Sequence, residues 1–311
     1  MDRATRRIEP GGCVGGGQLK LLSRLGEGGF GQVFLAETGQ GLKAVKVVDT
    51  SVWSEDEYEV FNAMLMAEAS FLGTLEHPVL PRFSNLLAED ACYYLIMEWV
   101  RGQNLQEHVG LHGPLDMEET FHLLGALIRV LHYFHRECEG GVVFGDLKPA
   151  NVLRAGPEEF RLVDLGLASK KGHRMGGRFS IFSPNFTAPE RIVGALSDPA
   201  QDLYSLGATV LFAVSGEEPH RGWSARAAQE AVRRWFRRAG HYWGEASLHC
   251  FKKLMTLLLA CVDPEPGGRP SGIRVLAQAW SRVEAVREEE TREASAPSAD
   301  QIMRLLYREK R

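Results

Sequence analysis

The chain has 311 residues, 44% of them hydrophobic, which is enough apolar material for about two globular domains. Its formal net charge of −4 gives no support to wholesale binding of nucleic acid, so we expect no nucleic-acid partner. The apolar runs are far shorter than the ~20 residues that cross a bilayer, and residues 1–18 lack the apolar stretch of a secretory signal. Five scattered cysteines form no C-x-x-C pair, and we therefore expect reduced thiols in a cytoplasmic protein without a membrane span.

Glycine dominates the start of the chain. Five glycines stand close together: Gly11, Gly12, Gly15, Gly16 and Gly17. Each costs backbone entropy to order, so residues 1–17 are predicted to be a flexible leader, with the folded part beginning at about residue 18.

The next segment alternates strand-like runs with turn residues. Residues 21–25 and 32–36 are predicted strands on either side of the loop 26–31, and a third strand is expected at 42–48. The G-x-G-x-x-G pattern of the loop is also the dinucleotide-binding fingerprint, and Asp49 lies about 20 residues downstream, where that fold has a ribose-binding acid. That fold opens a helix after the glycines, whereas residues 32–35 are Gln-Val-Phe-Leu. Because such residues favour a strand, we predict a hairpin whose glycine N–H groups can bind phosphate.

Two charged residues in this region stand on apolar faces. Lys46 lies in the third strand among alanine and valine neighbours. A helix is predicted over residues 55–75, and Glu68 falls on its otherwise apolar side with Leu65 and Leu72. A buried charge is costly unless it is paired, so we predict an ion pair between Glu68 and Lys46.

The residues that best fit a catalytic role stand close together in one short segment of the chain. Asp146, Lys148 and Asn151 stand close together, and Asp164, the first residue of an Asp-Leu-Gly triplet, follows Asn151 after thirteen residues. Phosphoryl transfer needs a carboxylate that accepts the proton of the nucleophile and hard oxygen ligands that hold Mg²⁺ on the phosphates. This spacing supplies both.

These segments resemble the D-L-x-x-x-N and D-F-G signatures of the eukaryotic-like Ser/Thr protein kinases, bacterial members included. Lys46 matches the V-A-I-K lysine, and Glu68 lies nine residues before His77, the distance typical of the αC glutamate. Further matches follow in the family's order up to about residue 280, namely Ala188-Pro189-Glu190, Asp202 and Arg269. The resemblance implies that Glu190 pairs with Arg269 and that Asp202 anchors the backbone of the catalytic loop, which begins at Val142 and leads into Asp146.

The resemblance also implies roles for the site residues. Asp146 would be the catalytic base, Lys148 would steady the γ-phosphate, Lys46 with Glu68 would hold the α- and β-phosphates, and Asn151 and Asp164 would bind Mg²⁺. Met97 would be the gatekeeper beside the adenine of ATP, and the hinge at about 98–103 would bond the adenine edge. The implied nucleotide-binding positions are Leu25, Gly26, Glu27, Gly28, Gly29, Phe30, Gly31, Val33, Ala44, Lys46, Met97, Glu98 and Val100.

The chain departs from the family at three positions. Phe144 and Gly145 replace the histidine and arginine of H-R-D, and Leu165 replaces the phenylalanine of D-F-G. Phe144 and Leu165 are predicted to meet in the core, where a larger ring opposite a smaller aliphatic side chain conserves volume. Gly145 lacks the guanidinium that in many relatives holds an activation-loop phosphate, so the chain is a non-RD variant whose activity is predicted to be intrinsic.

Helical periodicity begins after the hinge. Asp116 and Glu119 form a predicted capping box, followed by an apolar stripe that includes His135, interpreted as a core or capping histidine and not a metal ligand. Two surfaces suit a docking partner: the basic face of residues 233–238 with its aromatic anchors, and a short amphipathic helix near 302–307. The basic face is equally suited to having no partner, and the short helix could instead fold back on the kinase.

The predicted fold is α+β with two lobes. A small antiparallel β-rich N-lobe with one helix spans about 18–98, a larger mainly α-helical C-lobe spans about 104–285, and 286–311 form a charged tail. The predicted function is ATP- and Mg²⁺-dependent phosphorylation of serine or threonine in protein substrates, autophosphorylation included. Lys148 favours this over tyrosine kinases, and Ser183 matches the threonine of G-T-x-x-Y. A pseudokinase scaffold and a small-molecule kinase of the same fold are the alternatives.

Overall fold

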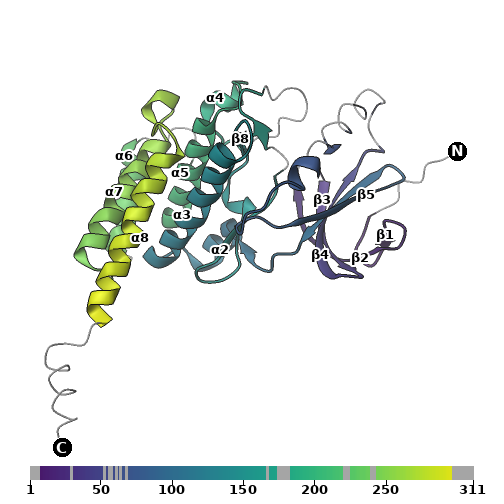
Figure 1. Ribbon diagram of the computed structural model, residues 1–311, viewed down its shortest axis with the longest axis horizontal. Helices are drawn as coiled ribbons and strands as arrows, with labels where there is room; N and C mark the ends of the chain where they lie inside the picture. The colour runs from purple at the N-terminus through teal and green to yellow at the C-terminus, as the bar shows by residue number, and fades with distance from the viewer. Residues whose placement is uncertain are drawn as a thin grey trace, which may run out of the picture.

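The computed structural model describes residues 8–28, 31–51, 54, 59, 62, 65–66, 69–165, 168–173, 183–219, 225–238 and 243–295. These residues form two lobes, a sheet lobe followed along the chain by a helical lobe (Figure 1). Within the described ranges no helix is both long and apolar enough to cross a membrane.

The N-lobe is built on one antiparallel sheet with the strand order β1-β2-β3-β4-β6-β5. The strands are β1 Cys13–Val14, β2 Leu19–Gly28, β3 Gly31–Thr38, β4 Gly41–Asp49, β5 Phe83–Glu89 and β6 Cys92–Glu98. β2 and β3 pair antiparallel up to Gly28 and Gly31. The predicted hairpin is therefore confirmed, and the dinucleotide-binding alternative is wrong, because a strand and not a helix follows the glycines.

Strand register determines which side chains lie on each face of this sheet, because paired residues point to the same side. Val45 pairs with Phe34 and with Ile96, and all three belong to one buried cluster. Lys46 stands on the opposite face, with Ala44 two residues earlier. Since Lys46 bonds Asp164 of the C-lobe, this second face is turned towards the other lobe.

The predicted flexible leader is wrong for its second half, because residues 8–17 join the sheet lobe. β1 pairs with the start of β2, and Val14 is buried. The chain reverses through Gly15, Gly16 and Gly17, whose φ angles of 63°, 65° and 83° favour glycine. The carboxylate of Glu89 accepts hydrogen bonds from the N–H groups of Gly15 and Gly16. The glycines that suggested disorder are thus the ones that this turn requires.

The helix predicted over 55–75 is described only in part. Residues 69–72 are helical, and Leu65 and Ala69 are buried. Glu68 lies outside the described residues, so its ion pair with Lys46 stays a prediction.

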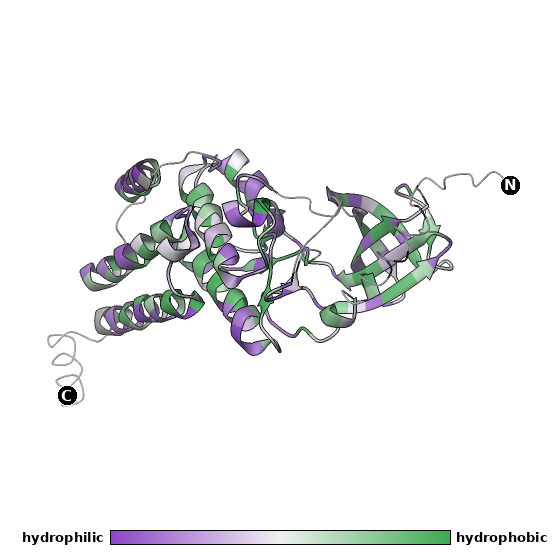
Figure 2. Cartoon of the chain, turned by 90° about the horizontal axis from the view of Figure 1, so that it is seen from above, coloured by the Kyte–Doolittle hydropathy of each residue, from purple (hydrophilic) through white to green (hydrophobic). Residues whose placement is uncertain are grey.

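The C-lobe is mainly helical, as predicted. Its helices are α2 Leu105–His112, α3 Met117–His132, α4 Pro189–Ile192, α5 Pro199–Ser215, α6 Ala225–Arg238, α7 Glu245–Cys261 and α8 Ile273–Ser295. Many of them show a hydrophobic and a hydrophilic side (Figure 2), and α5 is buried along most of its length. The C-lobe also contains two small sheets. The first consists of β7 Gln103–Asn104, β9 Val152–Arg154 and β10 Phe160–Leu162, and the second of β8 Val142–Val143 and β11 Ser169–Lys170.

The start of α3 follows the predicted capping box. Asp116 Oδ1 accepts the N–H of Glu119 at 2.8 Å, and Glu119 Oε2 accepts the N–H of Asp116 at 3.3 Å. The apolar stripe that follows is buried, and its last member, His135, lies in the short π-helix η1 Tyr133–Glu137. The stripe thus joins the core of the C-lobe, as its spacing predicts.

The predicted boundary at residue 285 is wrong, because α8 continues to Ser295 and its charged part packs on the C-lobe. Arg287 donates two hydrogen bonds to Glu118 of α3, and Glu290 accepts the N–H of Ala246 at 3.1 Å. The charges that suggested a solvated tail are used in contacts between helices. The amphipathic helix predicted near 302–307 lies outside the described residues.

Candidate active site

One buried carboxylate holds the backbone of the catalytic loop. Asp202, fully buried at the start of α5, accepts hydrogen bonds from the N–H groups of Phe144 at 2.7 Å and Gly145 at 2.8 Å. The same carboxylate lies 2.8 Å from Nε2 of His135. A buried carboxylate requires such partners. The predicted anchoring by Asp202 is confirmed, and His135 is a core histidine bound to that anchor.

Gly145 has a backbone conformation that few other residues could adopt. Its φ of 81° lies in the left-handed region, where a side chain with a Cβ is strained. An arginine here, as in H-R-D, would carry that strain. Next to it, Phe144 is fully buried against Phe134 and shares one hydrophobic core with Leu165. The departures from H-R-D and D-F-G are therefore accommodated by the fold.

Asp146 is surrounded by polar side chains. Lys148 Nζ and Asn151 Nδ2 donate to its Oδ2 at 2.7 and 2.9 Å, and Ser183 Oγ lies 3.5 Å from its Oδ1. Burial raises the pKa of Asp146 above its usual range, and Asp164 raises it further, although Lys148 and Asn151 act in the opposite direction. A carboxylate with a raised pKa is a better proton acceptor, as a general base requires.

Asp164 links the two lobes across the site. Lys46 Nζ, on the face of the sheet turned to the C-lobe, lies 3.0 Å from Asp164 Oδ1. Asp164 has a φ of 64°, which is uncommon for a residue other than glycine. Such conformations cluster at functional sites, and here the residue concerned is the one whose carboxylate contacts Lys46.

Four of the predicted nucleotide-binding positions share one face of the sheet. Ala44 pairs with Met97 across β4 and β6, and Val33 pairs with Lys46 across β3 and β4, so these four side chains share a face. Ala44 is buried, whereas Leu25 is 47% exposed. The remaining predicted positions are distributed between described and undescribed residues: Gly26, Glu27, Gly28, Gly31, Glu98 and Val100 are described, and Gly29 and Phe30 are not.

Gly31 is a position where only glycine fits. Its φ is 139°, and a Cβ there would collide with the backbone carbonyl oxygen of Val47 on β4. Gly26, in the same loop pattern, has open space around it. The close approach at Gly31 is what brings the end of the glycine loop down onto β4.

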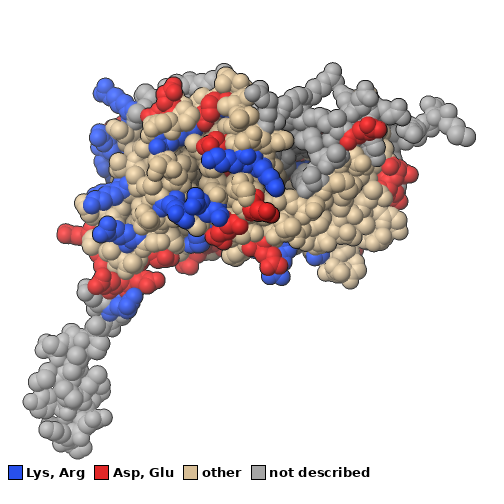
Figure 3. Space-filling view, turned by 45° about the horizontal axis from the view of Figure 1, so that its top comes forward, with Lys and Arg blue, Asp and Glu red and all other residues tan. Residues whose placement is uncertain are grey.

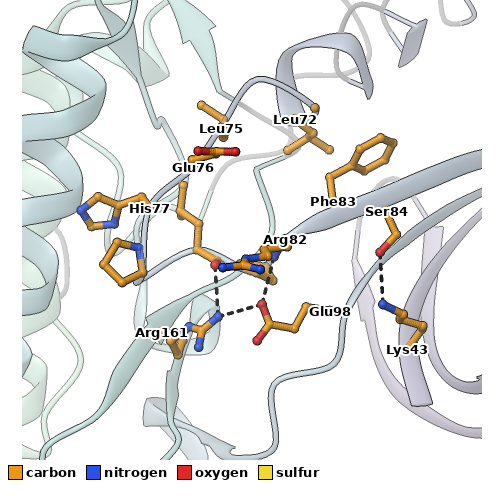
Figure 4. A pocket seen from close by; sticks show the side chains of 14 residues that line it. Lys43, Leu72, Leu75, Glu76, His77, Arg82, Phe83, Ser84, Glu98 and Arg161 are labelled. Atoms are coloured by element: carbon orange, nitrogen blue, oxygen red, sulfur yellow. Dashed lines mark hydrogen bonds and ion pairs between the residues drawn. The ribbon is translucent and has the colours of Figure 1, made fainter. Parts of the chain in front are cut away.

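The connection between the lobes has a network of its own (Figure 4). Glu98, at the end of β6, accepts hydrogen bonds from Arg161 Nη2 of β10 at 3.0 Å and from the N–H of Arg82 at 3.1 Å. Arg161 also donates to the carbonyl oxygen of Leu80 at 3.1 Å. These residues line a cavity of about 960 Å³ beside the hinge. Sequence reasoning gave Glu98 only a backbone role, and Arg161 had no sequence signal at all.

A bidentate ion pair ties Glu190 of α4 to Arg269, which precedes α8. Arg269, whose side chain is fully buried, donates to both carboxylate oxygens of Glu190 at 2.7 and 2.8 Å. The neighbouring Arg191 is also buried and donates to Gln201 at 3.0 Å. The predicted pair of Glu190 and Arg269 is confirmed, whereas nothing in the sequence pointed to Arg191.

Comparison with known proteins identifies the family. The sequence model of the protein kinase domain matches residues 19–281, and the chain belongs to that family. It is 27% identical to the serine/threonine-protein kinase PrkC of Bacillus subtilis over 213 residues, which are 67% of this chain and 32% of that protein. It is 27% identical to serine/threonine-protein kinase F of Synechocystis over 222 residues, 65% of this chain and 44% of that protein.

A mouse protein, sperm motility kinase 2B, is 28% identical over 269 residues, 85% of this chain and 51% of its own length. The matched regions thus span between about a third and a half of these relatives. The two-lobed fold described above is that of the protein kinase family.

Proposed function

We propose that this chain transfers the γ-phosphoryl group of ATP to serine or threonine hydroxyls of proteins. The observation that carries the proposal is the convergence of Asp146, Lys148, Asn151 and Ser183, with Lys46 and Asp164 joined beside them. The names of two similar proteins, both serine/threonine-protein kinases, support the choice of hydroxyl. The scattered cysteines support a cytoplasmic setting.

In this proposal, Asp146 accepts the proton of the attacking hydroxyl. Its raised pKa suits that role, and Lys148, 2.7 Å away, would be a point charge for the transferred phosphate. Lys46 would exchange its contact with Asp164 for the α- and β-phosphates. Ser183, close to Asp146, would orient the substrate segment.

The proposed Mg²⁺ ligands are Asn151 and Asp164. The amide nitrogen of Asn151 is engaged with the carbonyl oxygen and carboxylate of Asp146, which orients its amide oxygen as a possible hard ligand. Asp164 supplies a carboxylate, and one or two such groups with phosphate oxygens are the usual Mg²⁺ environment. When bound, Mg²⁺ neutralises charge that develops on the transferred phosphate.

Two other functions fit this site less well. A pseudokinase scaffold is suggested by Phe144 and Gly145, but the fold accommodates both while Asp146 keeps the surroundings of a base. A small-molecule kinase is disfavoured by Lys148 and by the anchored Glu190, because both belong to the protein-kinase pattern.

The test is incubation with γ-labelled ATP and Mg²⁺, alone and with generic protein substrates, followed by identification of the labelled residue. Asp146→Asn should lower the rate by roughly 10²–10⁴, because a positioned base is lost. Asp90→Asn is the matched control, since Asp90 is exposed at a positive φ that asparagine tolerates. Undiminished labelling by Asp146→Asn, or none by the parent protein, would contradict the proposal.

We also propose that activity is intrinsic, because Gly145 offers no guanidinium to a loop phosphate. Ser180, which lies outside the described residues, provides the test. Dephosphorylated Ser180→Ala protein should phosphorylate an exogenous substrate from the first seconds. A long lag, or a large loss of rate that phosphorylation of the parent protein restores, would mean that a phosphate controls the enzyme.

A further inference from the structure

A groove of about 550 Å³ lies between α6 and α7, formed by residues that take no part in the candidate active site. Val232 and Phe236 of α6 face Met255 and Leu259 of α7 and make its floor. Each pair is four residues apart, so each helix contributes one apolar stripe. The groove is thus an apolar channel between two helices.

The rim of this groove is basic. Arg233 and Arg237 of α6 line it, and their side chains are 71% and 70% exposed. Glu230 contacts both, at 4.0 and 3.1 Å, so one carboxylate serves two guanidinium groups. From α7, Lys252 lines the groove with its Nζ 5.9 Å from the centre of the Phe236 ring. The groove therefore has an excess of positive charge beside its apolar floor.

The charge of the two helices contrasts with that of the whole chain. α6 has five arginines and one glutamate, and α7 has two lysines and one glutamate, which gives the pair a formal charge of +5 in a chain of net charge −4. Lysine and arginine side chains gather over the helical lobe on the face seen in Figure 3. Such local asymmetry steers partners of opposite charge.

The aromatic anchors expected on this face divide into two kinds. Trp235 is buried and donates its indole N–H to the carbonyl oxygen of Leu115 at 2.7 Å, so it holds α6 in place. Phe236 is partly exposed and lines the groove. Only one of the two aromatic residues is available to a partner.

We propose that this groove is a docking site for an acidic amphipathic peptide segment of a protein partner. We identify this partner as the protein substrate. Only that identification rests on the proposed function, whereas the docking site itself does not. Leucine-like side chains would fill the floor, while carboxylates would pair with Arg233, Arg237 and Lys252. This mode is the recognition of an amphipathic segment in a groove between helices.

Two other occupants fit the chemistry less well. Residues 296–311 of the chain itself carry four basic and two acidic side chains, so the basic rim would repel them. Single-stranded nucleic acid binds through stacking on several aromatic rings, whereas this floor is mostly aliphatic, with Phe236 as its aromatic member.

The experiment measures binding to a labelled synthetic peptide with leucines at helical spacing and glutamates between them. Fluorescence anisotropy is recorded with full-length Asp146→Asn protein, so that catalysis does not interfere. The double variant Arg233→Glu/Arg237→Glu should weaken binding about tenfold at low ionic strength, and the difference should shrink at about 0.5 M salt. The matched control is Arg226→Glu/Lys253→Glu, which makes the same charge change at exposed positions outside the groove. It should bind within about twofold of the parent.

Several outcomes would overturn the proposal. They are equal weakening by both double variants, equal binding of a peptide with lysines in place of the glutamates, and tighter binding of a single-stranded oligonucleotide. Stronger binding after removal of residues 296–311 would identify the tail as the occupant. Sedimentation showing a dimer that Arg233→Glu/Arg237→Glu dissociates would identify a second copy of the chain.

Steady-state kinetics of the active protein distinguish a failure of the docking proposal from a failure of the proposed kinase activity. In the active protein, Arg233→Glu/Arg237→Glu should raise KM about tenfold for a substrate fused to the acidic peptide and leave kcat and the KM of a short generic substrate unchanged. Peptide binding without any label transfer by the parent would reject the kinase activity alone. Label transfer with no peptide binding would reject the docking site alone.

Discussion

The two lobes hold their parts of the candidate site by different means. In the C-lobe, buried charges bind the loops: Asp202 holds the catalytic loop, and Arg269 holds Glu190. In the N-lobe, strand register and backbone shape place the side chains, as at Gly31 and Ala44. Because of this difference, we expect substitutions that lower stability to be distinct from those that impair nucleotide binding. Changes in the C-lobe network should unfold the protein, whereas changes in the glycine loop should alter nucleotide binding.

The strongest test of this comparison is Asp202→Ala. The change leaves two buried N–H groups and His135 without their acceptor, so we expect a loss of ~3–5 kcal/mol of unfolding free energy. Thermal denaturation should show a fall in Tm of roughly 6–20 °C. The control is Asp198→Ala at the helix start, which should cost ~1 kcal/mol as the loss of one N-cap. Similar effects of both changes would remove the special role of Asp202.

Arg269→Ala tests the second buried charge. Because the carboxylate of Glu190 would lose its bidentate partner, we expect a cost of ~3–5 kcal/mol in denaturant unfolding, at the lower end since Glu190 is partly exposed. Arg274→Ala, at an exposed position of α8, should change stability by less than ~0.5 kcal/mol. A change at Arg269 within experimental scatter would show that the pair is not a structural anchor.

Gly31→Ala tests the role of backbone shape in the N-lobe. The new Cβ would collide with the carbonyl oxygen of Val47, so the end of the glycine loop must shift. We expect the KM for ATP to rise about tenfold, or ~1.4 kcal/mol, with a smaller change in Tm. Gly26→Ala has open space and should leave the KM nearly unchanged. A large fall in Tm without a change in KM would break the comparison.

Arg287→Ala examines the extension of α8. Arg287 pairs with Glu118 and lies 4.5 and 4.2 Å from the ring centres of Phe121 and Trp243. Its loss should cost ~1–3 kcal/mol, whereas Arg292→Ala, an exposed pair with Glu288, should cost ~0–0.5 kcal/mol.

The same pair predicts a pH dependence. Burial acts to raise the pKa of Glu118, but hydrogen bonds from Arg287 and Trp243 outweigh it and the net pKa is lowered. A lowered carboxyl pKa contributes stability above the unfolded value of about 4.3 that is lost as pH falls. The stability difference between parent and Arg287→Ala should therefore shrink in acid, and a constant difference would contradict this assignment.

The smallest expected effect is the contribution of Asp146, the proposed base, to the pH dependence of stability. Because the pKa of Asp146 is raised, the folded protein binds its proton more tightly than the unfolded chain does, and stability falls as pH rises through that range. Asp146→Asn removes this dependence. The Tm of the variant relative to the parent should therefore increase between about pH 3 and pH 7, as measured by calorimetry. A Tm difference that decreases with pH would contradict the raised pKa.

Local chemistry explains what the sequence could predict. The hairpin followed from residues 32–36, and the helix start from Asp116 and Glu119, because neighbours in the chain carry those signals. The roles of Asp202 and Arg269 followed from family resemblance, since each partner lies 57 or more residues away.

The errors arose where distant residues decide the structure. The glycines at 15–17 looked disordered because Glu89, whose carboxylate accepts the N–H groups of Gly15 and Gly16, is 74 residues away from Gly15. Likewise, the bond between Arg161 and Glu98 joins positions 63 residues apart, and no local pattern marks it. Periodicity and turn chemistry cannot report such partners.

The extension of α8 has a practical consequence for anyone who prepares fragments of this protein. The family match ends at residue 281, but a fragment cut there would lack Arg287 and Glu290. The aromatic surface of Phe121 and Trp243 would lose its cover, and exposed apolar surface of this kind promotes aggregation. Expression and crystallisation boundaries are therefore best set well beyond residue 290, so that both side chains are kept.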